Sequence, residues 1–262
     1  MIEWFCSLNH ITQAFIATLF TWSLTALGAA IVFFFKSVNK NIMDLSLGLS
    51  AGVMLAASFF SLLSPSIEMA EELNMIPWLV AAIGIILGGL LLFGFDKLEQ
   101  SFSNDGHLIN KRSRMLMTSI TLHNIPEGMA IGVAFGSLIY NLNGATLSAA
   151  CMLALGIGLQ NFPEGSAVSL PLRRDGLSRK KAFFMGQLSA IVEPIAGVLG
   201  AILVMKVRFL LPYLLAFSAG AMIYVIVCEL IPESQSNSNK SLMAFCTLIG
   251  FSIMMIMDVA LG

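Results

Sequence analysis

Apolar residues run in long stretches along this chain, and short polar segments separate them. A membrane-spanning α-helix needs about 20 consecutive apolar residues, whereas the elements of a soluble protein alternate apolar and polar positions at short intervals. Eight stretches meet or approach the length of a span. We expect membrane-spanning helices at residues 12–35, 45–64, 75–95, 115–139, 145–171, 182–205, 208–231 and 241–261.

The composition supports the same interpretation. Of the 262 residues, 57% are hydrophobic and only 11% are charged, and the mean hydropathy is +0.87. Soluble globular domains are about half apolar and about one quarter charged, so this composition excludes an ordinary soluble protein. We predict an all-α polytopic membrane protein in which residues 1–262 form a single membrane domain of eight transmembrane helices.

The basic residues are distributed unevenly between the two sets of loops. Every Lys and Arg except Lys206 and Arg208 lies in one of four loops, at residues 36–44, 96–114, 172–181 and 232–240. Loops rich in Lys and Arg face the cytoplasm. We therefore expect these four loops on the cytoplasmic side of the plasma (inner) membrane, and both termini on the extracytoplasmic side.

A polar motif occurs twice within the predicted spans. One copy, Leu-His-Asn-Ile-Pro-Glu-Gly, runs from Leu122 to Gly128, and the other, Leu-Gln-Asn-Phe-Pro-Glu-Gly, runs from Leu159 to Gly165. Residues three or four apart share one face of an α-helix. The polar side chains on that face are His123, Asn124 and Glu127 in the first copy, and Gln160, Asn161 and Glu164 in the second. A helical proline frees the carbonyl four residues earlier, so we expect proline-bent helices four and five to form a central metal site.

Carboxylates within the spans require a counter-charge. Glu127, Glu164 and Glu193 lie well inside apolar segments, where one ionised carboxylate costs on the order of 2.5–3.5 kcal/mol. No Lys or Arg lies at a comparable depth, which leaves protons or bound cations as the neutralising charge. Together with His123 and the amide oxygens, these carboxylates form a ligand set suited to a divalent transition metal.

These residues closely resemble the signature of the ZIP (Zrt-, Irt-like protein) divalent metal transporters, in particular the GufA-like branch. Further stretches match the same family. They are Ala-Gly-Val-Met-Leu-Ala-Ala-Ser-Phe in the second span, Glu-Pro-Ile-Ala-Gly in the sixth, and Ala-Gly-Ala-Met-Ile-Tyr-Val with Glu-Leu-Ile-Pro-Glu in the seventh. The resemblance implies eight spans, outward-facing termini, and a transport site between spans four and five.

The resemblance also implies two adjacent metal sites. His123, Glu127, Gln160 and Glu164 match the first, with Met54 close by. Asn124, Asn161 and Glu193 match the second, which shares Glu127 and Glu164. Some members carry an aspartate at the position of Asn161, so the second site of this chain has less negative charge. The chain also lacks the histidine-rich cytoplasmic loop that members commonly carry.

The expected activity is import of a divalent cation into the cytoplasm by alternating access. Motifs that match in oppositely directed spans suggest inverted repeats around a midplane site. Zn²⁺ is the most plausible transported substrate, and Fe²⁺, Mn²⁺, Co²⁺ and Cd²⁺ fit the same ligands. We expect no catalytic residues and no cofactor, and metal affinity should fall in acid because His123 binds metal only when unprotonated.

Two rival interpretations fit part of the pattern. A passive channel would use the carboxylates only to select cations. An intramembrane zinc protease would also place a histidine and a glutamate on one helix face, but it usually needs two histidines at HExxH spacing, which this chain lacks. The sequence leaves the oligomeric state open, a homodimer being a common arrangement for membrane transporters.

Overall fold

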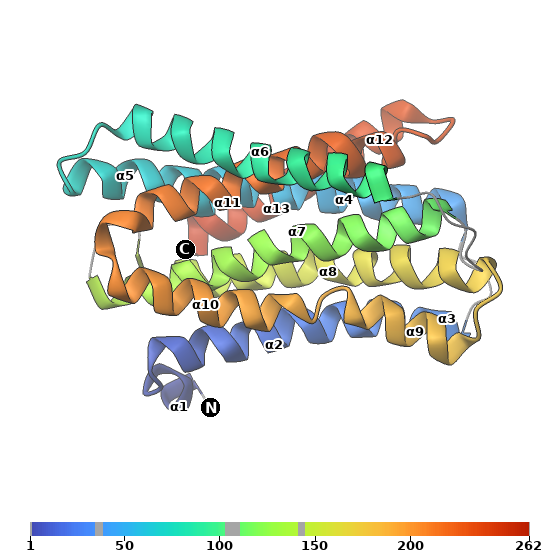
Figure 1. Cartoon of the computed structure of the whole chain (residues 1–262), viewed down its shortest axis with the longest axis horizontal. Helices are drawn as coiled ribbons and strands as arrows, with labels where there is room; N and C mark the ends of the chain where they lie inside the picture. Colours follow the sequence, from blue (N-terminus) through green and yellow to red (C-terminus); the bar gives the residue numbers. More distant parts are fainter. Residues whose placement is uncertain (1, 35–38, 103–110, 141–144, 262) are drawn as a thin grey trace.

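The computed structural model describes residues 2–34, 39–102, 111–140 and 145–261, and within these ranges it describes no side chain for residues 2–3, 99–102, 111–120, 122–123 and 261. The described residues are helical and contain no strand. Figure 1 shows the long helices lying side by side along one common direction. The α-helices, short ones included, are α1 (Ile2–Cys6), α2 (His10–Ala29), α3 (Ile31–Phe34), α4 (Lys40–Ala57), α5 (Ser64–Glu72), α6 (Pro77–Phe102), α7 (Lys111–Ser137), α8 (Leu147–Arg174), α9 (Arg179–Leu188), α10 (Val192–Lys206), α11 (Leu211–Val225), α12 (Ile231–Ser234) and α13 (Lys240–Leu261).

Side-chain caps fix where several of these helices begin. The Oδ1 atom of Asn9 accepts from the backbone N–H of Thr12 at 2.8 Å, at the start of α2. The Oγ1 atom of Thr146 accepts from the N–H of Ala149 at 3.0 Å, at the start of α8. Such caps satisfy backbone donors that have no partner in the first turn, so these two long helices have defined starts.

Two π-helical turns interrupt the second and seventh predicted spans. The turn η1 (Ser58–Leu63) joins α4 to α5, and η4 (Ile226–Leu230) joins α11 to α12. Each precedes a proline, Pro65 or Pro232. The helices of the polar motifs are assigned as continuous, because Pro126 lies inside α7 and Pro163 inside α8. Bends at those two prolines stay a prediction.

The same pattern of helix contacts occurs twice in the fold, and the helices of the second set run in the opposite direction to those of the first. The most extensive contacts pair α2 with α8, α7 with α10, α4 with α13, and α6 with α11. Exchanging α2 with α10, α4 with α11, α6 with α13, and α7 with α8 reproduces the same four pairs. In Figure 1 the helices so exchanged run in opposite directions, since α4 leads toward α5 at one end and α11 leads toward α12 at the other. The fold is thus an inverted repeat at the level of its helix contacts.

Two hydrogen bonds confirm this relation residue by residue. The hydroxyl of Ser66 donates to the carbonyl of Pro212 at 2.7 Å, and that of Ser234 donates to the carbonyl of Asp44 at 2.8 Å. The same number of residues separates Ser66 from Ser234 as separates Asp44 from Pro212. Each bond joins the helical segment α4–η1–α5 to the segment α11–η4–α12. The two repeats are thus hydrogen-bonded to each other at two equivalent positions.

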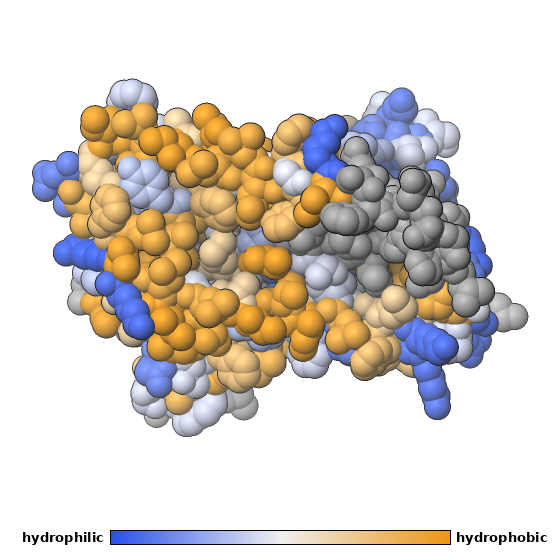
Figure 2. Space-filling model, in the orientation of Figure 1, coloured by the Kyte–Doolittle hydropathy of each residue, from blue (hydrophilic) through white to orange (hydrophobic). Residues whose placement is uncertain are grey.

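Six helical segments among the described residues are long and apolar enough to cross a membrane. Their ranges are His10–Phe34, Lys40–Glu72, Pro77–Leu98, Arg179–Lys206, Arg208–Ser234 and Lys240–Ala260. On the face shown in Figure 2, hydrophobic residues form a broad band between two more hydrophilic ends. The helices α7 and α8 span 27 and 28 residues but are not among the six. In α8 the amides and the carboxylate of the polar motif lower the average hydropathy. The helices of the described residues confirm the all-helical class, and the membrane segments confirm six of the eight expected spans.

Candidate metal site

The second copy of the polar motif lies in the middle of α8, and the first copy lies in α7. The side chains of Asn124, Glu127, Gln160, Asn161 and Glu164 are all at most 1% exposed. The helices α7 and α8 contact each other, and each also contacts α2. These five predicted residues are thus buried on neighbouring helices, whereas the His123 side chain lies outside the described residues.

Glycines allow the motif helices to approach their neighbours closely. A side chain at Gly128 would collide with the backbone of Glu193 on α10, and one at Gly165 would collide with the backbone of Thr25 on α2. Each glycine directly follows the motif glutamate. Glu127 and Glu164 therefore lie next to close backbone contacts, between α7 and α10 and between α8 and α2. The first of these contacts places Glu193 beside Gly128.

A break between α9 and α10 positions Glu193. The helix stops after Leu188 and resumes at Val192, so the fully buried Glu193 lies in the first turn of α10. A carboxylate in the first turn of a helix interacts favourably with the exposed N–H groups and the dipole there. The sequence predicted one uninterrupted span at 182–205, and the break is the feature that it missed.

The amide groups of the motif donate hydrogen bonds toward carboxylates and carbonyls. Gln160 Nε2 donates to Oε1 of Glu127, and Asn161 Nδ2 donates to Oε1 of Glu193 at 2.8 Å. Asn161 Nδ2 also lies 3.4 Å from the carbonyl oxygen of Thr21. Gln160 thus links α8 to α7, and Asn161 links α8 to α10 and α2. While the N–H₂ groups are bonded in this way, the amide oxygens of Gln160 and Asn161 have no hydrogen-bond partner among the described residues.

Asn124 repeats this arrangement on the other motif helix. Its Nδ2 donates to the carbonyl of Ser189 at 3.1 Å, as Asn161 does to that of Thr21. The spacing from Asn124 to Asn161 equals that between the two motif copies, and the spacing from Thr21 to Ser189 equals that from Ser66 to Ser234. The inverted repeat therefore extends into the polar centre.

Four buried oxygen atoms of the two motif copies have no hydrogen-bond donor among the described residues. They are Asn124 Oδ1, Glu127 Oε2, Gln160 Oε1 and Asn161 Oδ1. A buried acceptor without a partner is destabilising by roughly 1–3 kcal/mol, and most such atoms in proteins do have partners. Lone pairs on carboxylate and amide oxygens are also ligands for divalent cations. A bound cation would satisfy these atoms together.

The three buried carboxylates raise the negative charge of the same region. Glu164 and Glu193 lie close enough to Glu127 to repel it electrostatically, and Glu164 likewise repels Glu193. Repulsion of this kind in a buried region is relieved by protons or by a cation. Among the described residues, no three His, Cys, Asp or Glu side chains are placed so as to hold a metal by themselves. A site here would need amide oxygens or the His123 side chain, which lies outside the described residues.

Two further residues complete the comparison with the predicted site. Met54 is fully buried on α4, a helix that contacts α8. Thr21 was not predicted, although its hydroxyl donates to Oε2 of Glu193. A signal for Thr21 exists in the sequence, because Thr18, Thr21 and Thr25 recur at helical spacing along one buried face of α2.

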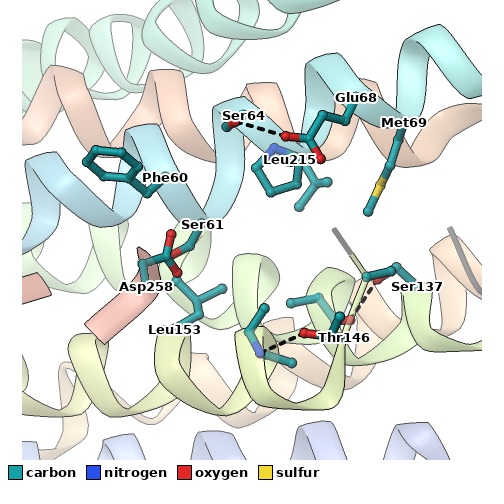
Figure 3. A pocket seen from close by; sticks show the side chains of 15 residues that line it. Phe60, Ser61, Ser64, Glu68, Met69, Ser137, Thr146, Leu153, Leu215 and Asp258 are labelled. Atoms are coloured by element: carbon teal, nitrogen blue, oxygen red, sulfur yellow. Dashed lines mark hydrogen bonds between the residues drawn. The ribbon is translucent and has the colours of Figure 1, made fainter. Parts of the chain in front are cut away.

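A separate cavity of about 170 Å³ opens at one end of the helices. Figure 3 shows Ser61 and Asp258 on one side of it and Glu68 on the other. The Ser61 hydroxyl donates to Asp258 Oδ1 at 2.9 Å, and the Ser64 hydroxyl donates to Glu68 Oε1 at 3.2 Å. The wall also includes Leu153 of α8, from the helix that carries the second motif. Glu68 and Asp258 therefore give this cavity a negative lining.

Comparisons with known proteins place the chain in a family. A family model described as ZIP Zinc transporter matches residues 99–258. The chain is 40% identical to the zinc transporter ZIP11 of Xenopus tropicalis over 97% of its own length and 98% of that protein. It is 34% identical to the zinc transporter GufA of Myxococcus xanthus, over 94% and 98% of the two chains. It is 33% identical to the zinc transporter ZIPB of Bordetella bronchiseptica, over 97% and 82%. By the family match and by these identities along nearly its whole length, the chain belongs to the ZIP zinc transporter family.

Proposed function

We propose that this protein carries divalent metal cations, Zn²⁺ foremost, across a membrane into the cytoplasm. The observation that supports it best is the set of four buried oxygen atoms, one each from Asn124, Glu127, Gln160 and Asn161, that have no donor among the described residues. Such a group is costly in a purely structural role. A cation bound there would be coordinated by these oxygen atoms, which would offset that cost. The relatives named above are zinc transporters.

The proposed ligands form two adjacent sites. His123, Glu127, Gln160 and Glu164 would hold the first ion, with the thioether of Met54 beside it. Asn124, Asn161 and Glu193 would hold the second, with Glu127 and Glu164 shared between the two. A mixed set of imidazole, carboxylate and amide ligands admits Zn²⁺ and also Fe²⁺, Mn²⁺, Co²⁺ and Cd²⁺.

The proposed membrane arrangement treats the chain as one domain of eight spans. Six segments meet the criterion of length and hydropathy, and we assign α7 and α8 as the other two because they run alongside the six in Figure 1. Their polar face is turned inward, where irregular or polar groups are tolerated in membrane proteins. The basic loops then face the cytoplasm, and both termini and the cavity at Asp258 face the other side.

Transport by alternating access is supported by how the helices group. Close backbone contacts at glycine join α7 to α10 and α8 to α2, as at Gly128 and Gly165, and they join α4 to α13 at Gly52. Between the two groups, the atoms nearest to Gly156 of α8 belong to the flexible side chain of Met254 on α13. One group of helices would move against the other around the metal. This favours a carrier over a passive channel, and a homodimer stays a prediction.

The test is uptake of ⁶⁵Zn²⁺ into proteoliposomes. The variants Glu127→Gln and Glu164→Gln keep the size of the side chain and remove its charge. The matched control is Glu71→Gln, because Glu71 is an exposed carboxylate near the end of α5. We expect saturable uptake that either motif variant abolishes and that the control retains. Uptake that is indifferent to both motif variants would refute the proposal, and unsaturable flux at high rate would indicate a channel.

A further inference from the structure

Three fully buried serines, Ser50, Ser169 and Ser218, have no hydrogen-bond partner among the described residues, and two of them, Ser50 and Ser218, lie at related positions of the chain. Ser58 donates to the carbonyl of Met54 at 2.8 Å, and Thr18 donates to that of Ala14 at 2.8 Å, each four residues earlier. Ser50 and Ser218 are fully buried, yet their hydroxyl oxygens have no hydrogen-bond partner among the described residues. A buried hydroxyl that forms no hydrogen bond with the carbonyl four residues earlier, or with any other group, is rare in proteins. Both serines therefore need an explanation.

The two serines occupy equivalent places in the inverted repeat. Ser50 begins Ser-Ala-Gly-Val-Met in α4, and Ser218 begins Ser-Ala-Gly-Ala-Met in α11. Each pentapeptide ends at a fully buried methionine, Met54 or Met222, and a π turn follows four residues later. The spacing from Ser50 to Ser218 is the one that relates Ser66 to Ser234.

The glycine in each pentapeptide shows which way the serine and methionine face. A side chain at Gly52 would collide with the backbone of Thr247 on α13, and one at Gly220 would collide with that of Ile85 on α6. With 3.6 residues per turn, positions two before and two after a residue lie on the opposite side of the helix. Each serine and methionine pair is thus directed away from that close neighbour.

Other contacts show what lies on that opposite side. The helix α4 contacts α8, and α11 contacts α7, which are the helices that carry the polar motifs. Met54 and Met222 belong to one continuous core cluster with residues of α7 and α8. Each pair, a hydroxyl one turn from a thioether, is thus presented to the motif helices from opposite repeats.

From this we infer that Ser218 and Met222 form a metal-contacting pair, the counterpart of Ser50 and Met54, and that the two pairs serve opposite conformations of the transport cycle. In carriers built from inverted repeats, one group of helices moves against the other around a site at the repeat interface, so that equivalent elements of the two repeats alternate in facing it. A metal that lies against one pair in one state lies against the equivalent pair in the other. This inference rests on the proposed function.

The chemistry of the pairs predicts a role in metal preference. Thioether sulfur is a soft ligand and favours softer ions, whereas Mn²⁺ favours oxygen ligands. Met222 would therefore help the carrier retain Zn²⁺ and Cd²⁺ relative to Mn²⁺ in the second state. The hydroxyl oxygen of Ser218 would add a neutral oxygen ligand in place of the hydrogen bond that it lacks.

The test compares metal preference in proteoliposomes loaded with matched variants. Met222→Leu keeps the approximate volume and removes the sulfur, and the double variant Ser218→Ala with Met222→Leu removes both ligands. The control is Met243→Leu, because Met243 is buried on α13. We expect inhibition of ⁶⁵Zn²⁺ uptake by Cd²⁺ to weaken several-fold relative to inhibition by Mn²⁺ in the Met222 variants alone. Met222→Cys, which restores a soft ligand, should restore the preference for Cd²⁺.

A second measurement tests the assignment of the two pairs to opposite states. Half-saturating Zn²⁺ concentrations are measured for influx and for efflux in Met54→Leu and Met222→Leu. We expect the two variants to raise the value from opposite sides of the membrane. Shifts from the same side would overturn the assignment, and an unchanged Cd²⁺ to Mn²⁺ ranking in the double variant would overturn the metal contact. If the wild type itself takes up no metal, the proposed function fails rather than this inference.

Discussion

Glu193 on α10 occupies the place that Thr25 holds on α2. The backbone of Glu193 contacts Gly128, and that of Thr25 contacts the equivalent Gly165. Four residues before them, the carbonyls of Ser189 and Thr21 accept from the two motif asparagines. The centre of the inverted repeat is therefore symmetric in backbone but not in charge, because only one repeat carries a carboxylate at this place.

This asymmetry predicts that the second metal depends on Glu193. The variant Glu193→Gln retains an oxygen and the approximate shape but loses the charge that helps to neutralise a second cation. We expect the purified variant to bind one Zn²⁺ where the wild type binds two, as counted by elemental analysis after equilibrium dialysis. Two bound ions in Glu193→Gln would contradict the assignment of this residue to the second site.

Thr21 is predicted to support metal binding through Glu193. Its hydroxyl donates to Oε2 of Glu193, and partners that orient a ligand typically change metal affinity by about 10–100-fold when removed. We expect Thr21→Val, which keeps the branched shape, to weaken Zn²⁺ binding by about tenfold at the low end of that range. Isothermal titration of the detergent-solubilised protein measures this change.

Thr18→Val is the matched control for that experiment. Thr18 is equally buried on α2, but its hydroxyl donates only to carbonyls of its own helix, those of Ala14 and Phe15. Its loss should leave Zn²⁺ affinity unchanged. Equal weakening in both variants would indicate a general effect on α2 and would remove the reason for assigning Thr21 to the site.

The glycines that follow the motif glutamates are predicted to be intolerant of any side chain. In Gly128→Ala and Gly165→Ala the added methyl group meets backbone atoms of a neighbouring helix, and overpacking of this kind typically destabilises by about 1–3 kcal/mol. We expect lower thermal unfolding temperatures in detergent and loss of uptake. Gly94→Ala is the control, because nothing lies within 4 Å of a Cβ at that position. A helix-interior glycine in open space should gain about 0.5–1 kcal/mol on replacement by alanine.

The all-helical class and the grouping of the motif residues on helix faces were accessible from the sequence for a physical reason. Helical spacing places His123, Asn124 and Glu127 on one face whatever the rest of the chain does, and apolar length alone locates the spans. The π turns were not accessible, because one extra residue in a turn leaves hydropathy unchanged, and Pro65 and Pro232 only hint at them. Thr21 was missed because a threonine that also bonds to its own helix does not interrupt an apolar pattern.

The partners of Asn124 and Asn161 were also beyond sequence reasoning. Their donors reach carbonyls of Ser189 and Thr21 on other helices, and which helices meet depends on close packing at particular glycines. Apolar periodicity shows that a helix has neighbours but does not name them. The inverted repeat is defined by these contacts between particular helices, which the sequence pattern does not contain.

The cavity at the end of the helices leads to the last prediction. Asp258 and Glu68 line it, and a cleft lined by one sign of charge raises the local concentration of the opposite ion. We expect Asp258→Asn to raise the Zn²⁺ concentration that gives half-maximal uptake while leaving the maximal rate nearly unchanged, because the transport site itself is intact. The difference from wild type should shrink at high ionic strength, where a partly exposed charge is screened. Glu71→Gln, outside the cavity lining, is the control. A fall in maximal rate at saturating Zn²⁺ would contradict this role and would indicate that transport needs the hydrogen bond from Ser61 to Asp258, which joins the π turn η1 to α13.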